Sequence, residues 1–230
     1  MAAYQRYAIY FCPNENSELS EFGARWLGWD IHRGAHREQF VFSDLPKPLD
    51  EITKRPRKYG FHATLKAPFH LAMGVDQEDL LSALVDFSTS ASPVDLSQIE
   101  LVEMGRFIAL KPGATNKVLQ TFAQQIVQEF DRFRAPLSAE TRARYGAKNL
   151  NSKQAKFLEK WGYPFVFDAF RFHMTMTGPL NGEDRNACLQ VLTRKMHPML
   201  KAPIILDHLA LCGEREDGHF QVIEQVPLKG

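Results

Sequence analysis

Two stretches of the chain, FHATLKAPF at 61–69 and FHMTMTGPL at 172–180, share the order Phe-His-x-Thr, an apolar residue and a later proline. Histidine titrates near neutral pH, so its imidazole can accept or donate a proton at little cost. Threonine is stiff at χ1, which holds its hydroxyl ready to donate to an oxygen that gains charge. Two such pairs, His62 with Thr64 and His173 with Thr175, could therefore act together on one phosphate as acid, base and oxygen-binding groups.

The two stretches are predicted to be strands, in which alternate side chains share a face. Each histidine then points the same way as its threonine, and the apolar residues between them face the core. The same parity places Lys66, Arg171 and Thr177 on the histidine face and, unless a bulge intervenes, Tyr59 on the core face. A cation beside each His–Thr pair is what a bound phosphate requires.

Other catalytic chemistries fit the sequence less well. Neither stretch contains a carboxylate, and the chain has no His-Glu-x-x-His and no cysteine pair at zinc spacing. It also has no Gly-x-Ser-x-Gly, no P-loop and no Gly-x-Gly-x-x-Gly. One His-x-Thr arises easily by chance, but two matched copies do not. We therefore predict a site without a metal and without a cofactor.

The repeat extends beyond these stretches. Each histidine strand is followed by a predicted helix, at 76–87 and at 184–196, and then by a predicted hairpin. The first hairpin turns about Gly105 and the second through EREDG. This order predicts an α+β fold of two related lobes with largely antiparallel pairing. Residues 1–230 are expected to form a single bilobal unit with His-x-Thr at 62–64 and 173–175.

The remaining segments are predicted from their patterns. We expect a strand in YQRYAIYF, a helix near 16–29 capped by Ser17 or Asn16, loop with at most one short turn of helix at 43–58, and a long helix over 116–133. A connector at about 131–163 matches nothing in the first lobe. Over 131–160 it holds eight Lys or Arg against three Asp or Glu. It is interpreted as a solvated helical hairpin capped by Ser138 and Ser152, or as a cover over an anionic ligand.

The composition is that of a folded protein, with 44% hydrophobic and 24% charged residues in a chain of 230. A net charge of +1 argues against binding of long nucleic acid, because such binding usually needs a clear excess of basic residues. The three cysteines form no paired pattern, and no stretch reaches the roughly 18 apolar residues of a membrane span. These features predict a cytoplasmic protein with no membrane contact and no evident obligate protein partner.

The paired motif resembles the signature of the two-histidine (2H) phosphoesterases, which include RNA 2′-5′ ligase-like proteins and cyclic nucleotide phosphodiesterases. The resemblance is closest to the branch encoded with phosphonate-utilisation (carbon–phosphorus lyase) operons. It rests on ARWLGWD at 24–30, PRKYGFHATLKAPF at 56–69, FDRFRAPLSAE at 130–140 and KWGYPFVFDAFRFHMTMTGPL at 160–180.

The resemblance implies a bilobal fold of two pseudo-symmetric lobes, each with an antiparallel sheet and outer helices, and a cleft lined by both His–Thr pairs. It implies that His62 and His173 are the acid–base pair and that Thr64 and Thr175 bind phosphoryl oxygens. The resemblance assigns no role to the residues that are specific to the phosphonate branch. The candidate substrate contacts are Lys66, Arg171, Thr177, Tyr59 and Arg142.

These observations predict a metal-independent cyclic phosphodiesterase acting on a small phosphorylated ribose compound or nucleotide. The phosphonate context favours a ribosyl cyclic phosphate. A non-catalytic binder of phosphorylated ligands or RNA ends is one alternative, and RNA 2′-5′ end-joining at the same site is another. RNA is the less favoured partner because of the near-zero net charge. The near-symmetric pair does not tell which histidine is the base.

Overall fold

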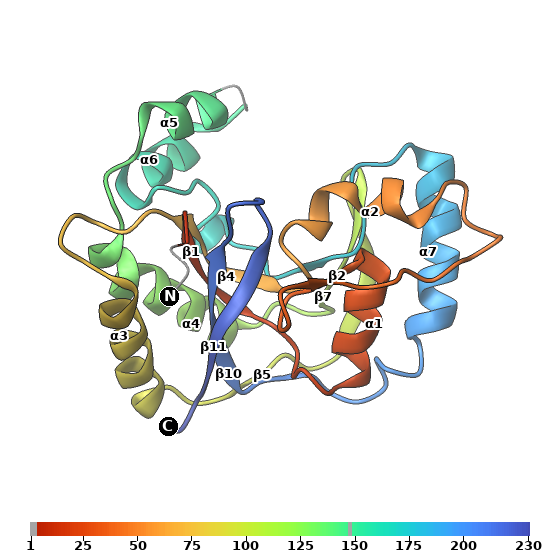
Figure 1. The fold of residues 1–230 in the computed structure, drawn as a ribbon, viewed down its shortest axis with the longest axis horizontal. Helices are drawn as coiled ribbons and strands as arrows, with labels where there is room; N and C mark the ends of the chain where they lie inside the picture. Colours follow the sequence, from red (N-terminus) through yellow and green to blue (C-terminus); the bar gives the residue numbers. More distant parts are fainter. Residues whose placement is uncertain (1–3, 147–148) are drawn as a thin grey trace.

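The structure is a computed structural model that describes residues 4–146 and 149–230. Antiparallel strands and outer helices confirm the predicted α+β class (Figure 1). The helices are α1 (Glu18–Leu27), α2 (Leu49–Arg57), α3 (Gln77–Ser90), α4 (Lys117–Glu129), α5 (Ala139–Gly146), α6 (Ser152–Trp161) and α7 (Gly182–Met196), with 3₁₀ turns η1 (Phe130–Phe133) and η2 (Phe167–Ala169). The strands are β1 (Tyr7–Phe11), β2 (Trp29–Asp30), β3 (Ala35–His36), β4 (Ala63–Phe69), β5 (Val94–Asp95), β6 (Ile99–Met104), β7 (Phe107–Pro112), β8 (Met174–Thr175), β9 (Ile205–Leu206), β10 (His208–Glu214) and β11 (Phe220–Pro227).

The main sheet has seven strands in the order β11-β10-β1-β4-β8-β7-β6. The hairpin β6–β7 follows the first histidine stretch in the sequence, yet it pairs with β8 of the second stretch. The hairpin β10–β11 follows the second stretch and pairs with β1, next to β4 of the first. The two repeats therefore exchange hairpins. Their strands join into one sheet where Ala63 of β4 pairs with Met174 of β8.

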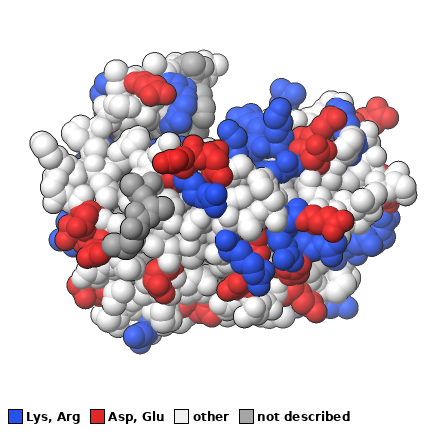
Figure 2. All heavy atoms as spheres, viewed as in Figure 1, with Lys and Arg blue, Asp and Glu red and all other residues white. Residues whose placement is uncertain are grey.

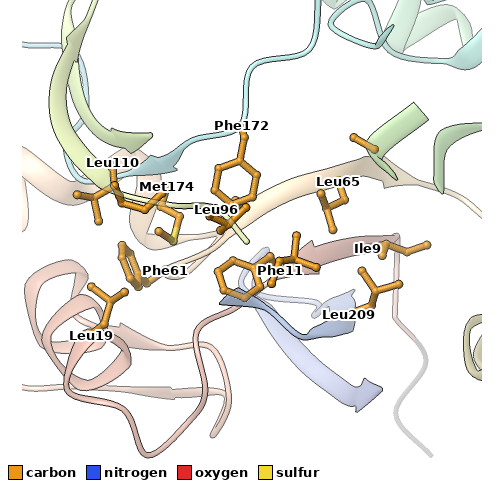
Figure 3. Close-up of a cluster of buried hydrophobic side chains, with 14 of the residues drawn as sticks. Ile9, Phe11, Leu19, Phe61, Leu65, Leu96, Leu110, Phe172, Met174 and Leu209 are labelled. Atoms are coloured by element: carbon orange, nitrogen blue, oxygen red, sulfur yellow. The ribbon is translucent and has the colours of Figure 1, made fainter. Parts of the chain in front are cut away.

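The two faces of this sheet are covered differently. On one face, apolar residues of α1, α2, α3, α4 and α7 pack against the sheet in one large core. Figure 3 shows Phe61 and Leu65 of the first stretch, with Phe172 and Met174 of the second, in this core. All four are almost fully buried, which confirms the predicted alternation across the His-x-Thr part of each stretch. The histidines and threonines consequently lie on the opposite face.

A smaller cluster covers part of that opposite face. It contains alternate residues of β1 and β10 with side chains that follow α1 and one from β11. Its members are Ala8, Tyr10, Cys12, Trp29, Ile31, Ala210, Cys212 and Phe220. The histidine face is thus walled by apolar residues on the β1 side.

The segment 43–58, predicted as loop with at most one short turn of helix, contains the nine-residue helix α2, so the helix is longer than predicted. Leu49, Ile52, Thr53 and Pro56 recur at helical spacing and are all buried. The proline lies in the last turn, where it ends the helix and does not break it. Burial of this face outweighs the polar composition that favoured a loop.

The connector forms helices α5 and α6, which project from the body in Figure 1. The Ser138 hydroxyl accepts the Thr141 amide at 3.1 Å, as expected of a cap, but α6 is capped by Asn151 and not by Ser152. A capping box with Gln154 explains the choice. Residues 147–148 of the predicted connector lie outside the described residues. No helix in the described ranges is both long and apolar enough to cross a bilayer.

Candidate functional site

The two His–Thr pairs lie on neighbouring antiparallel strands. Ala63 pairs with Met174, and continuing this register by one residue sets Thr64 opposite His173 and His62 opposite Thr175. Directly opposite residues share one face of the sheet. Each histidine is therefore adjacent to the threonine of the other repeat, and the structure brings together all four residues that were predicted to be catalytic.

Both imidazoles are held by the same kind of contact. Nδ1 of His62 lies 3.0 Å from the carbonyl oxygen of Gly60, and Nδ1 of His173 lies 2.7 Å from that of Arg171. A carbonyl oxygen only accepts, so each Nδ1 must carry the proton. In the neutral ring Nε2 is then the acceptor, and that of His62 lies 3.1 Å from the Thr64 hydroxyl. The two repeats thus present equivalent basic nitrogens to the same face.

Gly60 is required where it stands. Its φ of +68° is left-handed, and a Cβ there would lie 2.6 Å from Cβ of Ile31. An L-residue would strain the backbone and push the chain that carries the His62 contact. The sequence stretch Tyr-Gly-Phe-His is therefore a local device for orienting the first imidazole.

The surroundings of the two histidines differ. The ring of His62 stacks on that of Tyr10 with centroids 3.9 Å apart, and the ring of Tyr59 lies 6.2 Å away. Burial lowers the pKa of His62 to about 4; the Gly60 carbonyl opposes this shift and His173 adds to it. His173 has one described ring neighbour, Phe107, at 5.9 Å. At neutral pH His62 is an unprotonated base.

A cavity of about 380 Å³ opens beside the pairs. Thr64, Arg171 and His173 supply its polar wall, and the rest is mainly apolar and aromatic. The other lining residues are Leu65, Ala67, Met104, Phe107, Val127, Tyr163, Phe165, Val166, Phe167, Ala169 and Phe170. The segment 163–170 that follows the connector thus forms one side of the cavity.

Two predicted substrate contacts lie near the pairs. Arg171 is exposed at the cavity wall, and one of its terminal nitrogens donates to the carbonyls of Asp168 and Phe170, both at 2.7 Å. These bonds fix the guanidinium at the cavity. Tyr59 was predicted on the core face, and this is wrong: its side chain is partly exposed and stacks on Phe220.

Lys66 does not share the face of His62, so its predicted position is wrong. A register irregularity between Ile9 and Tyr10 of β1 interrupts the alternation of β4, and Lys66 pairs with Ile9. Its ammonium is buried, donates to the Val127 carbonyl at 3.2 Å and lies 3.6 Å from Asp131. Burial lowers its pKa to about 8, and Asp131 opposes that shift.

Thr177 and Arg142 also lie outside the pair. The Thr177 hydroxyl is buried and accepts a hydrogen bond from the Ile108 amide at 3.0 Å. It therefore links the residues that follow β8 to β7. Arg142 of α5 makes two bonds of 2.9 Å to Glu159 of α6 and holds the two helices together. Neither side chain lines the cavity beside His173.

Basic side chains gather on α2, the helix that precedes the first histidine stretch. The last turn of α2 holds Lys54, Arg55 and Arg57 directly before the first histidine stretch. Figure 2 shows Lys and Arg over α2, across a hollow from the projecting helices α5 and α6. Arg57 donates to the Leu27 carbonyl and is structural. The other cations can attract an anion towards the hollow.

Sequence reasoning missed Tyr10 and the aromatic wall at Tyr163, Phe165 and Phe167. Tyr10 stands in an apolar strand like any core residue, and only its pairing with Thr64 across the sheet reveals its position. The aromatic cluster of 163–170 was visible in the sequence but carried no spacing signal. Among the described residues, no three or more His, Cys, Asp or Glu side chains are grouped to hold a metal.

Comparison with known proteins gives three kinds of match. Residues 64–221 match a family described as "Protein of unknown function (DUF1045)". A curated relative from Janthinobacterium sp. (strain Marseille), named ribose 1,5-bisphosphate phosphokinase PhnN, is 31% identical over 231 residues. The match covers 98% of this chain and 51% of the relative. A protein of the same name from Laribacter hongkongensis (strain HLHK9) is 28% identical, with 93% and 49% covered. The chain spans about half the length of these curated relatives.

Solved structures also match over 98–100% of their length. TT0787 of Thermus thermophilus is 12% identical, with 98% of both chains covered and a TM-score of 0.45. E. coli LigT in complex with NADP+ is 13% identical, with 100% of both chains covered and a TM-score of 0.44. A protein described as a phosphoesterase gives 12% identity and a TM-score of 0.43, with 98% of this chain and 99% of its own covered. These low values assign no activity.

Proposed function

The chain belongs to the DUF1045 family, whose description states no activity, and we propose from the chemistry of its own site that it is a cyclic phosphodiesterase. The observation that carries this proposal is the matched orientation of His62 and His173. A backbone carbonyl holds each Nδ1, which leaves each Nε2 as the nitrogen that exchanges a proton on one face. Such paired groups suit a reaction that needs a base and an acid at the same phosphorus.

The proposed reaction opens a cyclic phosphodiester with water. The water oxygen attacks phosphorus and gives a proton to Nε2 of His62, which is unprotonated at neutral pH. The bond from phosphorus to one ribose oxygen breaks, and Nε2 of a protonated His173 supplies the proton to that oxygen. One water is consumed, and the product is a phosphomonoester with a free hydroxyl.

The neighbouring polar groups have matching roles in this proposal. The hydroxyls of Thr64 and Thr175 donate to the phosphoryl oxygens as these gain charge in the transition state. Arg171 at the cavity wall adds a positive charge. A bound anionic phosphate also favours protonation of His62, which raises its pKa towards the range where a base transfers protons efficiently.

Within this class we propose a ribosyl cyclic phosphate as substrate. The curated relatives carry the name ribose 1,5-bisphosphate phosphokinase, and this chain matches about half their length. Opening a 5-phosphoribosyl 1,2-cyclic phosphate at the C2 oxygen leaves a phosphate on C1 and yields ribose 1,5-bisphosphate. That product is the compound in the relatives' name, so the two halves of such a relative would perform consecutive steps.

The test is hydrolysis of a 5-phosphoribosyl 1,2-cyclic phosphate and of nucleoside 2′,3′-cyclic phosphates in the presence of EDTA. We expect His62→Ala and His173→Ala each to reduce kcat by about 10² to 10⁴. His197→Ala is the control because His197 is exposed at the end of α7. Full activity in both site variants would refute the mechanism. Salt-dependent RNA binding without turnover would favour a binding protein, and joining of RNA ends would favour a ligase.

A further inference from the structure

The contact between Tyr10 and His62 is the closest ring stacking in the described part of the chain. The two centroids lie 3.9 Å apart with an angle of 28° between the planes. Tyr10 is fully buried in β1, where its partner across the sheet is Thr64. One aromatic side chain thus lies beside both members of the first His–Thr pair.

The tyrosine is itself held firmly. Its ring packs on Phe220, with centroids 5.9 Å apart, and Phe220 also stacks on Tyr59 at 5.4 Å. The imidazole of His62 therefore rests on Tyr10 and has Tyr59 near its edge. With Nδ1 bonded to the Gly60 carbonyl, the ring can neither tilt nor rotate freely.

The hydroxyl of Tyr10 gives a second, independent observation. It is buried and has no hydrogen-bond partner among the residues that the structure describes. A buried hydroxyl without a partner usually destabilises a protein, so this group contributes nothing to packing that phenylalanine would not. The ring, and not the hydroxyl, is what the fold uses at this position.

We propose that Tyr10 is a positioning residue: its ring fixes the plane of the His62 imidazole and excludes water from one side of it, so that His62 and not His173 serves as the base. This inference rests on the proposed function, because a base is defined only for the proposed hydrolysis. The titratable groups that face His62 are Tyr10 from β1, Tyr59 from the segment before β4, and His173 beside β8. Of these, His173 acts on its charge directly.

The asymmetry between the repeats supports the assignment. His173 has the same carbonyl contact at Nδ1, but its described ring neighbour is Phe107 at 5.9 Å with the planes at 47°. Both repeats thus have the motif and the carbonyl contact at Nδ1, and among the described residues only the first histidine has a stacked ring. A pair that is symmetric in sequence becomes asymmetric through one residue of β1.

The experiment uses the wild-type chain with Tyr10→Phe and Tyr10→Leu. Nuclear magnetic resonance of ¹³C,¹⁵N-labelled histidine follows the titration and the ring-proton shifts of His62 and His173. We expect the carbon-bound ring protons of His62 to be shifted upfield by the stacked ring in the wild type and in Tyr10→Phe. In Tyr10→Leu this shift should disappear, and the pKa of His62 should move towards its ordinary value near 6.5.

Activity gives a separate readout. We expect Tyr10→Phe to keep the wild-type kcat, and Tyr10→Leu to lose on the order of tenfold to a hundredfold in kcat with KM unchanged. The acid limb of its pH–rate profile should move to higher pH. A purely structural role would lower the melting temperature without moving the titration or the pH profile.

Several results overturn the inference. One is a wild-type His62 whose ring protons show no upfield shift, a measurement that needs no variant to fold. Another is a folded Tyr10→Leu that titrates like the wild type. If no cyclic phosphate is hydrolysed by the wild type, the proposed function fails, while the ring shift and the titration still decide whether Tyr10 positions His62.

Discussion

Ala63 of β4 and Met174 of β8 pair across the middle of the sheet, and neither side chain is exposed to solvent. Each lies between the histidine and the threonine of its own motif. The register of this one pair therefore sets the relative position of all four residues that would act on the phosphate. The packing of these two buried side chains therefore helps to determine the geometry of the site.

We expect Met174→Ala to lower the free energy of unfolding by about 2–5 kcal/mol, because it leaves a cavity in a buried position. It should also reduce kcat, because β8 can shift against β4. Leu84→Ala is the matched control: Leu84 is equally buried, but it lies on α3. Urea unfolding and steady-state kinetics measure both effects. Equal kcat in the two variants would contradict the coupling.

Gly60→Ala should destabilise the protein and reduce kcat. Gly74→Ala is the control because Gly74 also has a positive φ, of +80°, but has open space around it. The control should cost about 1 kcal/mol for the backbone conformation alone. The Gly60 variant adds the clash with Ile31 and displaces the carbonyl that holds His62. If the two variants lose the same stability and keep the same kcat, the carbonyl contact has no role.

Arg171→Met should raise KM for a cyclic phosphate by about tenfold, the worth of one hydrogen bond to a charged group. Arg142→Met removes an equal charge from the exposed ion pair with Glu159, and should leave KM unchanged. Initial rates over a range of substrate concentrations separate the two. A rise in KM for the Arg142 variant would mean that the connector reaches the substrate.

Lys66→Met should leave KM unchanged and should not lower the free energy of unfolding at pH 7. The buried ammonium is desolvated, and Asp131 retains its bond of 2.8 Å to Arg134. Replacing a buried ion by an apolar side chain of similar size is often neutral or stabilising. Chemical denaturation and KM measurements test this together. A tenfold rise in KM would indicate that Lys66 contacts the substrate.

His62 should make stability fall in mild acid. Its pKa is about 4 in the folded protein and near 6.5 in the unfolded chain. Above pH 6.5 it is neutral in both states. As the pH falls from about 6.5 to about 4, only the unfolded chain takes up the proton, so the free energy of unfolding decreases. The loss is at most about 3.5 kcal/mol at about 1.4 kcal/mol per pKa unit, and less where solvent reaches the ring.

Urea unfolding between pH 4 and pH 8 measures this dependence. His62→Gln should flatten the curve over that range because glutamine does not titrate. A wild-type curve as flat as that of His62→Gln would show that burial does not lower the pKa of His62. His219→Gln serves as a second comparison, since burial also lowers the pKa of His219, whose ring packs beside Trp29.

The sequence predicts the parts of this molecule that have a local cause. Ser17 caps α1 as predicted, and Asp76, the first residue of the helix predicted over 76–87, caps α3. The alternation in FHATL and FHMTM places both His–Thr pairs on one face, because a strand has a strict period of two. These features depend on neighbours within a few residues.

The features that escaped the sequence depend on distant partners. Lys66 lies on another face than predicted because β1 pairs with β4 in an irregular register. Tyr10 gained its position beside His62 from strand pairing, and the helix α2 formed because the core buries one of its faces. Nor did the repeat reveal that the two hairpins cross over, because each pairs with a strand far away in the chain.

The exchanged hairpins have a consequence for how the chain folds. The last two strands complete the sheet beside β1, where Arg6 and Glu214 form an ion pair although 208 residues separate them. Contacts of such long range close large loops and slow the folding of a domain. Neither half of the chain contains all the strands that flank its own histidine, so a fragment of either half would expose unpaired edges. We therefore expect the candidate site to form late and cooperatively, and a chain cut in the connector to regain it only when both fragments associate.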